Sequence, residues 1–139
     1  METLDESLTG RIDQLRAMHI CAGAITAFAN RHAEKAFEMA EIEASTCRRI
    51  ELEEIARICS RVPLNPPSTF REALQYYWFV HLGVTTELNP WDSFSPGKLD
   101  QHLLPFYLRD IENGILSREQ AEELLQCLWI KFNNQPAPP

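Results

Sequence analysis

The sequence lacks several features that would assign it to a familiar functional class. Its 139 residues carry 13 lysines and arginines against 20 acidic residues, a formal net charge of -7. Nucleic-acid binding needs a basic surface, so we expect no nucleic-acid partner. The five glycines lie far apart and form no phosphate-binding loop, and no apolar run approaches the roughly 18 residues of a membrane span. No signal peptide is visible at the acidic N-terminus, so we expect a cytoplasmic protein.

The cysteines and histidines exclude further classes of site. The cysteines are Cys21, Cys47, Cys59 and Cys127, and the histidines are His19, His32, His81 and His102. Their spacing matches neither a C-x-x-C pair nor a zinc or iron site, so we predict no disulfide framework and no metal site. No thiol has a base beside it that would activate it as a nucleophile. Each cysteine lies in a helical pattern, and we expect small buried thiols in a reducing compartment.

What the sequence does contain is helical periodicity along most of its length. One apolar seam repeats at alternating three and four residues and consists of Leu15, Met18, Ala22, Ile25 and Ala29. The seam is lost near Ser45, where we expect a break between two helices. The pattern predicts helices over about 4–44, 47–61, 69–84, 99–112 and 118–133. No stretch shows the sustained alternation of a strand, so the predicted fold class is all-α.

Local signals predict where several helices begin and end. Three prolines within Val62–Ser68 end the second helix, because proline lacks an amide donor and restricts the residue before it. Thr69–Glu72 and Ser117–Gln120 have the spacing of capping boxes. Asn113-Gly114 is typical of a helix end.

Two side-chain patterns bear on packing. Arg49, Glu53 and Arg57 are spaced by four residues along the second helix, so we expect ion pairs on its exposed face. The chain has more large aromatic residues than a helical piece of this size encloses, namely Tyr77, Trp78, Trp91, Trp129 and Phe132. We therefore expect some of this apolar surface to be exposed when the chain is alone.

The stretch ELNPWDSFSPGK, residues 87–98, differs from the helical sequence around it. Turn formers lie at both of its ends, at Asn89-Pro90 and at Ser95–Gly97. Between these turns lie Trp91, Asp92, Ser93 and Phe94. On a stiff connection, the carboxylate and the hydroxyl can bind a substrate while the two rings form the pocket wall. In the alternative interpretation, the carboxylate caps a turn and the tryptophan fills the core.

Two long stretches of the chain resemble a known family. The first runs from Arg48 to Leu82 and includes VPLNPPSTFREALQ, and the second runs from Glu87 to Asn134 and includes SPGKLDQ and LPFY. In order and spacing, these motifs are similar to those of the glycyl radical enzymes related to pyruvate formate-lyase. The resemblance covers most of the chain from about Arg31 onward.

The resemblance implies a fold and a chemistry that lie mostly outside this chain. Family members fold as a larger α/β barrel in which a cysteine becomes a thiyl radical and a glycine stores the radical, installed by a separate radical-SAM activase. The chain contains neither the Cys-x-Glu nor the Arg-x-x-Gly-Tyr sequence of those two residues. Residues 1–139 therefore resemble a partial pyruvate formate-lyase-like domain from the N-terminal half, with no catalytic residue and no cofactor of its own. The proline-rich end at Pro136–Pro139 also favours an interrupted chain.

The resemblance gives the loop at residues 87–98 a role. In relatives, the residues just before the Ser-x-Gly-Arg motif hold polar groups of the substrate, and counting back from Gly97 places these positions at Asp92 and Ser93. A carboxylate there suits a cationic group. The sequence TELNPWDSFSPG is most similar to that of the subgroup that dehydrates 4-hydroxyproline. The secondary amine of 4-hydroxyproline would be that cation. Lys98 replaces the arginine that is usual in the family, which removes a bidentate guanidinium.

Two functional hypotheses of different class follow. In the first, the chain is an inactive fragment of a radical lyase or dehydratase of anaerobic metabolism, which cleaves a C–O or C–C bond in a small polar substrate such as trans-4-hydroxy-proline. In the second, it is a non-catalytic helical or structural protein that complements a separately encoded remainder of the enzyme. Neither hypothesis involves a nucleic acid or a membrane.

Overall fold

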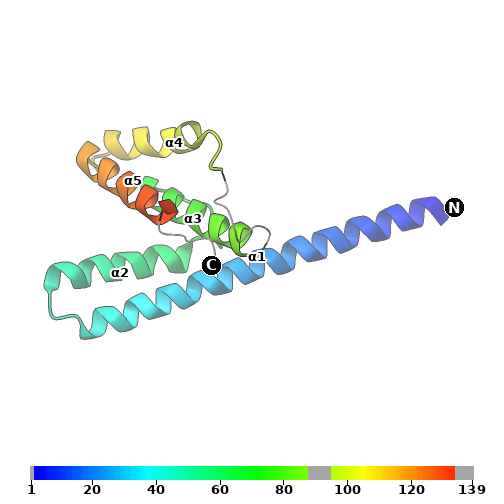
Figure 1. Cartoon of the computed structure of the whole chain (residues 1–139), viewed down its shortest axis with the longest axis horizontal. Helices are drawn as coiled ribbons and strands as arrows, with labels where there is room; N and C mark the ends of the chain where they lie inside the picture. Colours follow the sequence, from blue (N-terminus) through cyan, green and yellow to red (C-terminus); the bar gives the residue numbers. More distant parts are fainter. Residues whose placement is uncertain (1, 88–94, 134–139) are drawn as a thin grey trace.

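The computed structural model describes residues 2–87 and 95–133, with side chains for residues 8–86 and 95–133. These residues form five helices and no strand (Figure 1). The helices are α1 (Glu2–Ile42), α2 (Thr46–Arg61), α3 (Phe70–Glu87), α4 (Leu99–Glu112) and α5 (Arg118–Asn133). The predicted all-α fold class is confirmed for this part of the chain. α3 continues beyond residue 84, its predicted end, and so enters the stretch 87–98.

α1 and α2 form an antiparallel hairpin (Figure 1). Ser45 begins α2 as its N-cap, and its side chain accepts a hydrogen bond from the Arg48 amide at 3.5 Å. The buried residues of α1 are the small side chains Ala29, Ala33, Ala36 and Ala40, and those of α2 are Leu52, Ala56, Ile58 and Cys59. Small side chains let two helices approach closely, so the hairpin is held by packing along this alanine stripe.

α3 belongs to two hydrophobic cores. Its Phe79 packs with Ala29 and Ala33 of α1 and with Cys59 of α2. The other core, between α3, α4 and α5, consists of Phe70, Ala73, Leu74, Leu99, Leu103, Ala121 and Leu128. α3 thus lies between the α1–α2 hairpin and the pair formed by α4 and α5 (Figure 1).

The turn between α4 and α5 follows the sequence signals closely. Gly114 has a φ of 67°, in the left-handed region that favours glycine. At the start of α5, the Ser117 amide donates to Gln120 Oε1 at 2.8 Å, and the Gln120 amide donates to Ser117 Oγ at 3.2 Å. The predicted capping box at Ser117–Gln120 is therefore confirmed in both of its hydrogen bonds.

The expectation that the chain exposes apolar surface is confirmed. Trp129 is 52% exposed, whereas Tyr77, Trp78 and Phe132 are partly buried against the core, and Trp91 lies outside the described residues. The N-terminal half of α1 projects beyond α2 (Figure 1). Within the described residues, no helix combines the length and the apolar character that crossing a membrane requires.

The prediction that all four cysteines are buried is wrong for three of them. Cys59 is buried between α1, α2 and α3, but Cys21, Cys47 and Cys127 are exposed. Cys21 lies on the projecting half of α1, and Cys47 lies in the first turn of α2. A helical pattern beside apolar residues indicates which face is apolar, but burial also needs a packing partner on that face.

Gly83 is the position at which α3 comes close to α1. A Cβ added there would lie 3.1 Å from Ile25 Cδ1, whereas a Cβ at Gly23 of α1 would meet nothing within 4 Å. We predict that Gly83→Leu lowers the free energy of unfolding by about 1–3 kcal/mol through overpacking. Gly23→Leu, the matched control, should raise it by about 0.5–1 kcal/mol because leucine favours the helix more than glycine does. Urea titrations followed by circular dichroism measure both, and equal stability of the two variants would contradict the packing.

Candidate functional site

The structure describes both flanks of the predicted substrate loop but not its centre. Trp91, Asp92, Ser93 and Phe94 lie outside the described residues, so their proposed roles stay predictions. On the N-terminal side, α3 continues as far as Glu87. On the C-terminal side, the described chain resumes at Ser95.

The C-terminal flank has the geometry of a turn that leads into α4. Gly97 has a φ of 61°, where other residue types are strained, and its amide donates to Ser95 Oγ at 3.4 Å. Lys98 stands at the N-cap of α4, is exposed and makes no capping hydrogen bond with its side chain. The glycine in Ser95–Gly97 is therefore required by the backbone, as the turn prediction implies.

The N-terminal flank is a buried cluster of polar and aromatic side chains on α3 and α5. His81 and Thr85 are each 2% exposed and lie one turn apart, and the Thr85 hydroxyl donates to the His81 carbonyl at 2.9 Å. The His81 ring lies 4.5 Å from the Phe132 ring and is stacked on Trp78 at 5.4 Å. Burial raises the pKa of the neighbouring Tyr77. His81 is therefore part of the packing between α3 and α5, and this packing supports the C-terminal end of α3.

The described residues offer no metal site, and the buried thiol of Cys59 is not activated. No group of three or more histidine, cysteine, aspartate or glutamate side chains in these residues could hold a metal ion. Burial raises the pKa of the Cys59 thiol to about 11. A thiol with so high a pKa carries little thiolate at neutral pH, so Cys59 is not prepared to act as a nucleophile.

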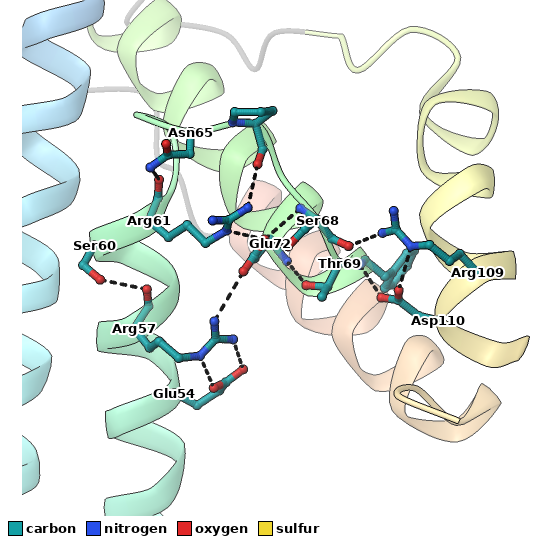
Figure 2. Close-up of polar contacts among 12 residues, drawn as sticks. Glu54, Arg57, Ser60, Arg61, Asn65, Ser68, Thr69, Glu72, Arg109 and Asp110 are labelled. Carbon is teal, nitrogen blue, oxygen red and sulfur yellow. Dashed lines mark hydrogen bonds and ion pairs between the residues drawn. The ribbon is translucent and has the colours of Figure 1, made fainter. Parts of the chain in front are cut away.

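At the N-terminal end of α3, away from the loop, a buried carboxylate joins three segments (Figure 2). The Glu72 side chain is 1% exposed and accepts from the Ser68 amide at 2.8 Å and the Ser68 hydroxyl at 2.7 Å. Two arginines of α2 also donate to it, Arg61 Nε at 3.1 Å and Arg57 Nη1 at 3.4 Å. Glu72 thereby connects α2, the proline-containing segment Val62–Thr69, and α3.

The hydrogen bonds around Glu72 differ in two ways from those predicted. In the box at Thr69–Glu72, the Glu72 amide donates to Thr69 Oγ1 at 3.2 Å as expected, but the carboxylate bonds to Ser68 instead of the Thr69 amide. The expected pair of Glu53 with Arg57 is wrong, because Arg57 forms a two-point contact with Glu54 at 2.9 and 2.8 Å. This fork geometry leaves the third nitrogen of Arg57 free to reach Glu72.

Opposing effects set the pKa of Glu72. Burial raises the pKa by removing water from the charged form, while the Ser68 amide and hydroxyl and the Arg61 guanidinium lower it. The hydrogen bonds and the positive charge outweigh burial, so the pKa of Glu72 lies below its ordinary value. The carboxylate is therefore charged in the folded protein at neutral pH.

A second buried carboxylate, that of Asp110, connects α4 to the start of α3. Its side chain is 2% exposed, and its Oδ2 accepts from the Phe70 amide at 2.6 Å, which caps the start of α3. The neighbouring Arg109 donates to Asp110 Oδ1 at 3.4 Å and also to the Ser68 carbonyl (Figure 2). Sequence reasoning missed Asp110, although a signal exists. Asp110 falls on the stripe of Leu99, Leu103 and Phe106, where an acidic residue on an otherwise apolar face indicates a buried hydrogen bond.

We call the bonds of Glu72 and Asp110 to their partners the carboxylate clamp. The clamp lies at Phe70, and the 18 residues of α3 span about 27 Å from there to Glu87. It joins α3 to α4 at the end opposite the loop at residues 87–98. The clamp therefore positions α3 and α4, the two helices on either side of the loop.

We predict that Glu72→Gln lowers the free energy of unfolding at pH 7 by about 2 kcal/mol, the usual worth of hydrogen bonds to a charged group. Because the folded-state pKa of Glu72 is lowered, its contribution is complete above the unfolded pKa of roughly 4.3. The contribution is lost as the pH falls through the lower folded-state value. Below about pH 5, the wild type should therefore lose stability more steeply than the glutamine variant.

Urea titrations across this pH range measure the stability of the Glu72→Gln variant and compare it with a variant that loses a more exposed ion pair. Glu54→Gln removes the partner of Arg57 whose side chain is 34% exposed, and it should cost less than about 1 kcal/mol. Parallel pH profiles for the wild type and Glu72→Gln would contradict the lowered pKa.

Comparison with known proteins shows which family the chain resembles. Residues 1–139 match the family described as pyruvate formate lyase-like. The chain is 58% identical over 125 residues to trans-4-hydroxy-L-proline dehydratase of Clostridioides difficile, covering 90% of this chain and 16% of that protein. It is 43% identical over 116 residues to isethionate sulfite-lyase of Oleidesulfovibrio alaskensis, covering 84% of this chain and 14% of that protein.

A solved structure has the same arrangement of helices. It is the crystal structure of hydroxyproline dehydratase from Clostridioides difficile with trans-4-hydroxy-L-proline bound, at a TM-score of 0.78 and 60% sequence identity. The match covers 82% of this chain and 14% of that one. The chain thus spans only 14 to 16% of the length of these relatives. From the family match and these identities, the chain belongs to the pyruvate formate lyase-like family of glycyl radical enzymes.

Proposed function

We propose that this chain is the helical, loop-bearing part of a radical dehydratase that acts on trans-4-hydroxy-L-proline. The observation that carries the proposal is the 58% identity to a dehydratase named for that substrate, against 43% to an isethionate sulfite-lyase. That match extends over 125 of the chain's 139 residues and leaves 14 outside. Wherever it begins, it includes residues 15–125 and hence the whole loop at residues 87–98.

In this proposal, the loop binds the substrate through two polar side chains. The substrate has a secondary amine, which is cationic at neutral pH, together with a carboxylate and a hydroxyl. Asp92 pairs with the cation through a charge-assisted hydrogen bond, and Ser93 donates a neutral hydrogen bond to a substrate oxygen. The carboxylate clamp supports this role, because it fixes α3 and α4 at their far ends and so limits how the two ends of the loop can move.

Bond cleavage belongs to the rest of the enzyme. The family's glycyl radical supplies hydrogen-atom abstraction once an activase has installed it. The chain contains neither the Cys-x-Glu sequence nor the Arg-x-x-Gly-Tyr sequence, so its residues fit neither radical-bearing position. The remaining part of the enzyme, about 85% of the length of the relatives, is in the same polypeptide or in a separately encoded one. In the second case, this chain acts as a helical partner that complements the catalytic chain.

We predict that the 139-residue chain alone acquires no glycyl radical. The purified chain is incubated without oxygen with a family activase and S-adenosylmethionine, and its EPR spectrum is recorded. The full-length dehydratase of Clostridioides difficile serves as the positive control. A glycyl doublet from the chain alone would show that the radical residue lies within these residues, contrary to the proposal.

We predict that Asp92→Asn impairs turnover in a full-length dehydratase that carries residues 87–98 of this chain. Asparagine keeps the shape and the turn-forming ability of aspartate but removes the charge. The loss of a buried charge-assisted hydrogen bond should lower kcat/KM by about 30- to 1,000-fold, or roughly 2–4 kcal/mol. The yield of glycyl radical should stay unchanged, because the loop does not hold the radical.

Ser93→Ala provides the comparison for a neutral hydrogen bond, with an expected cost of about 0.5–1.5 kcal/mol. A kcat/KM for Asp92→Asn within about threefold of the parent, or less than about 0.7 kcal/mol, would favour the turn-capping interpretation of Asp92.

A further inference from the structure

The middle of α1 contains a segment without acidic or basic residues other than a histidine, and with large apolar side chains on opposite sides. From Ala17 to Asn30, the sequence has no aspartate, glutamate, lysine or arginine. Side chains two positions apart on a helix point to roughly opposite sides, and Met18 and Ile20 are both large and apolar. From Ala17 to Ala24, His19 is the one polar side chain apart from the thiol of Cys21, so this part of the helix lacks the broad polar stripe that a surface helix normally turns to water.

The part of this segment from Ala17 to Ala24 is nevertheless exposed in the described structure. Met18 is 66% exposed and Ile20 is 68% exposed, and every other residue from Ala17 to Ala24 is exposed as well. Burial begins only at Ile25 and Ala29, where α2 and α3 pack on α1.

The all-round apolar character distinguishes between possible partners. A second copy of the chain, paired through a coiled-coil seam, would cover one stripe of the helix and leave the opposite side in water. A helix that is apolar on all sides is typical of the interior of a large protein. Within the described residues, no helix is long and apolar enough to cross a membrane.

The remainder of the relatives' length is large enough to enclose this helix on all sides. The match to the dehydratase includes residues 15–125 and hence this segment, and 84% of that enzyme lies outside the match. We propose that residues Ala17–Ala24 of α1 are enclosed by the remainder of the glycyl radical enzyme, which contacts both Met18 and Ile20. This inference rests on the proposed function. The ion pair of Arg16 with Asp13, at 3.4 Å and exposed to solvent, marks the end of the enclosed segment.

The test places one substitution in two contexts. Ile20→Glu is made in the 139-residue chain and in a full-length chimera, in which this chain replaces the matching part of the Clostridioides difficile dehydratase. Ile50→Glu is the matched control, because Ile50 is 59% exposed on α2 among the charged residues Arg48, Arg49 and Glu51. Soluble yield, thermal unfolding and the mass in solution are measured for each protein.

In the isolated chain, neither substitution should change the unfolding temperature, because both side chains are exposed there. In the chimera, Ile20→Glu should reduce the yield of folded enzyme by about tenfold or more, since it buries an unpaired charge, while Ile50→Glu should change it less than about twofold. Ile20→Leu should restore the folded yield. Hydrogen exchange should show the amides of Ala17–Ala24 protected in the chimera and fast-exchanging in the isolated chain.

Three results would overturn the inference. The first is a chimera whose folded yield is reduced less than about twofold by Ile20→Glu, as is expected for Ile50→Glu. The second is equal sensitivity of the chimera to both substitutions, and the third is a stable dimer of the isolated chain that Ile20→Glu dissociates. Failure of the proposed function has a different signature. A chimera that shows the expected dependence on Ile20 but does not dehydrate trans-4-hydroxy-L-proline would refute the substrate and leave the enclosed helix intact.

Discussion

The ionised carboxylate of Glu72 is the constraint on which the arrangement of the helices depends. It is 1% exposed, and it is held in place by the backbone and side chain of Ser68 and by Arg57 and Arg61 of α2. Through Ser68, the same bonds reach Arg109 and Asp110 of α4. The α1–α2 hairpin and the α3–α5 group have separate cores that share α3, so the orientation of α3 sets how these two groups of helices lie relative to each other.

The features that sequence predicts well here are those decided by neighbouring residues. The break at Ser45, the end of α2 before the prolines, and the capping box at Ser117–Gln120 all depend on contacts within four positions. The predicted turn at Ser95–Gly97 is also a local feature, and Gly97 has the positive φ that glycine tolerates in turns. Family membership was also recognisable, because the order of several motifs along the chain is more specific than any one of them.

The features that sequence did not predict depend on distant residues. Asp110 caps α3 across 40 positions, and Arg57, which pairs with Glu54, also reaches Glu72 because the fold brings this buried carboxylate close to it. Three cysteines are exposed in the described structure, because a helical pattern does not show whether another helix packs over a given face. Asp92 and Ser93 lie outside the described residues, and their proposed roles rest on similarity to a family, because neither periodicity nor spacing could establish them.

The central claim is that these helices are a portion of a radical dehydratase whose chemistry lies elsewhere in the enzyme. Sequencing the coding DNA on the 3′ side of the Pro139 codon tests this most directly. The account predicts an open frame, continuous with this one or beginning as a neighbouring gene, that encodes a Cys-x-Glu sequence and then an Arg-x-x-Gly-Tyr sequence. A downstream region that encodes neither sequence in any frame would contradict the account.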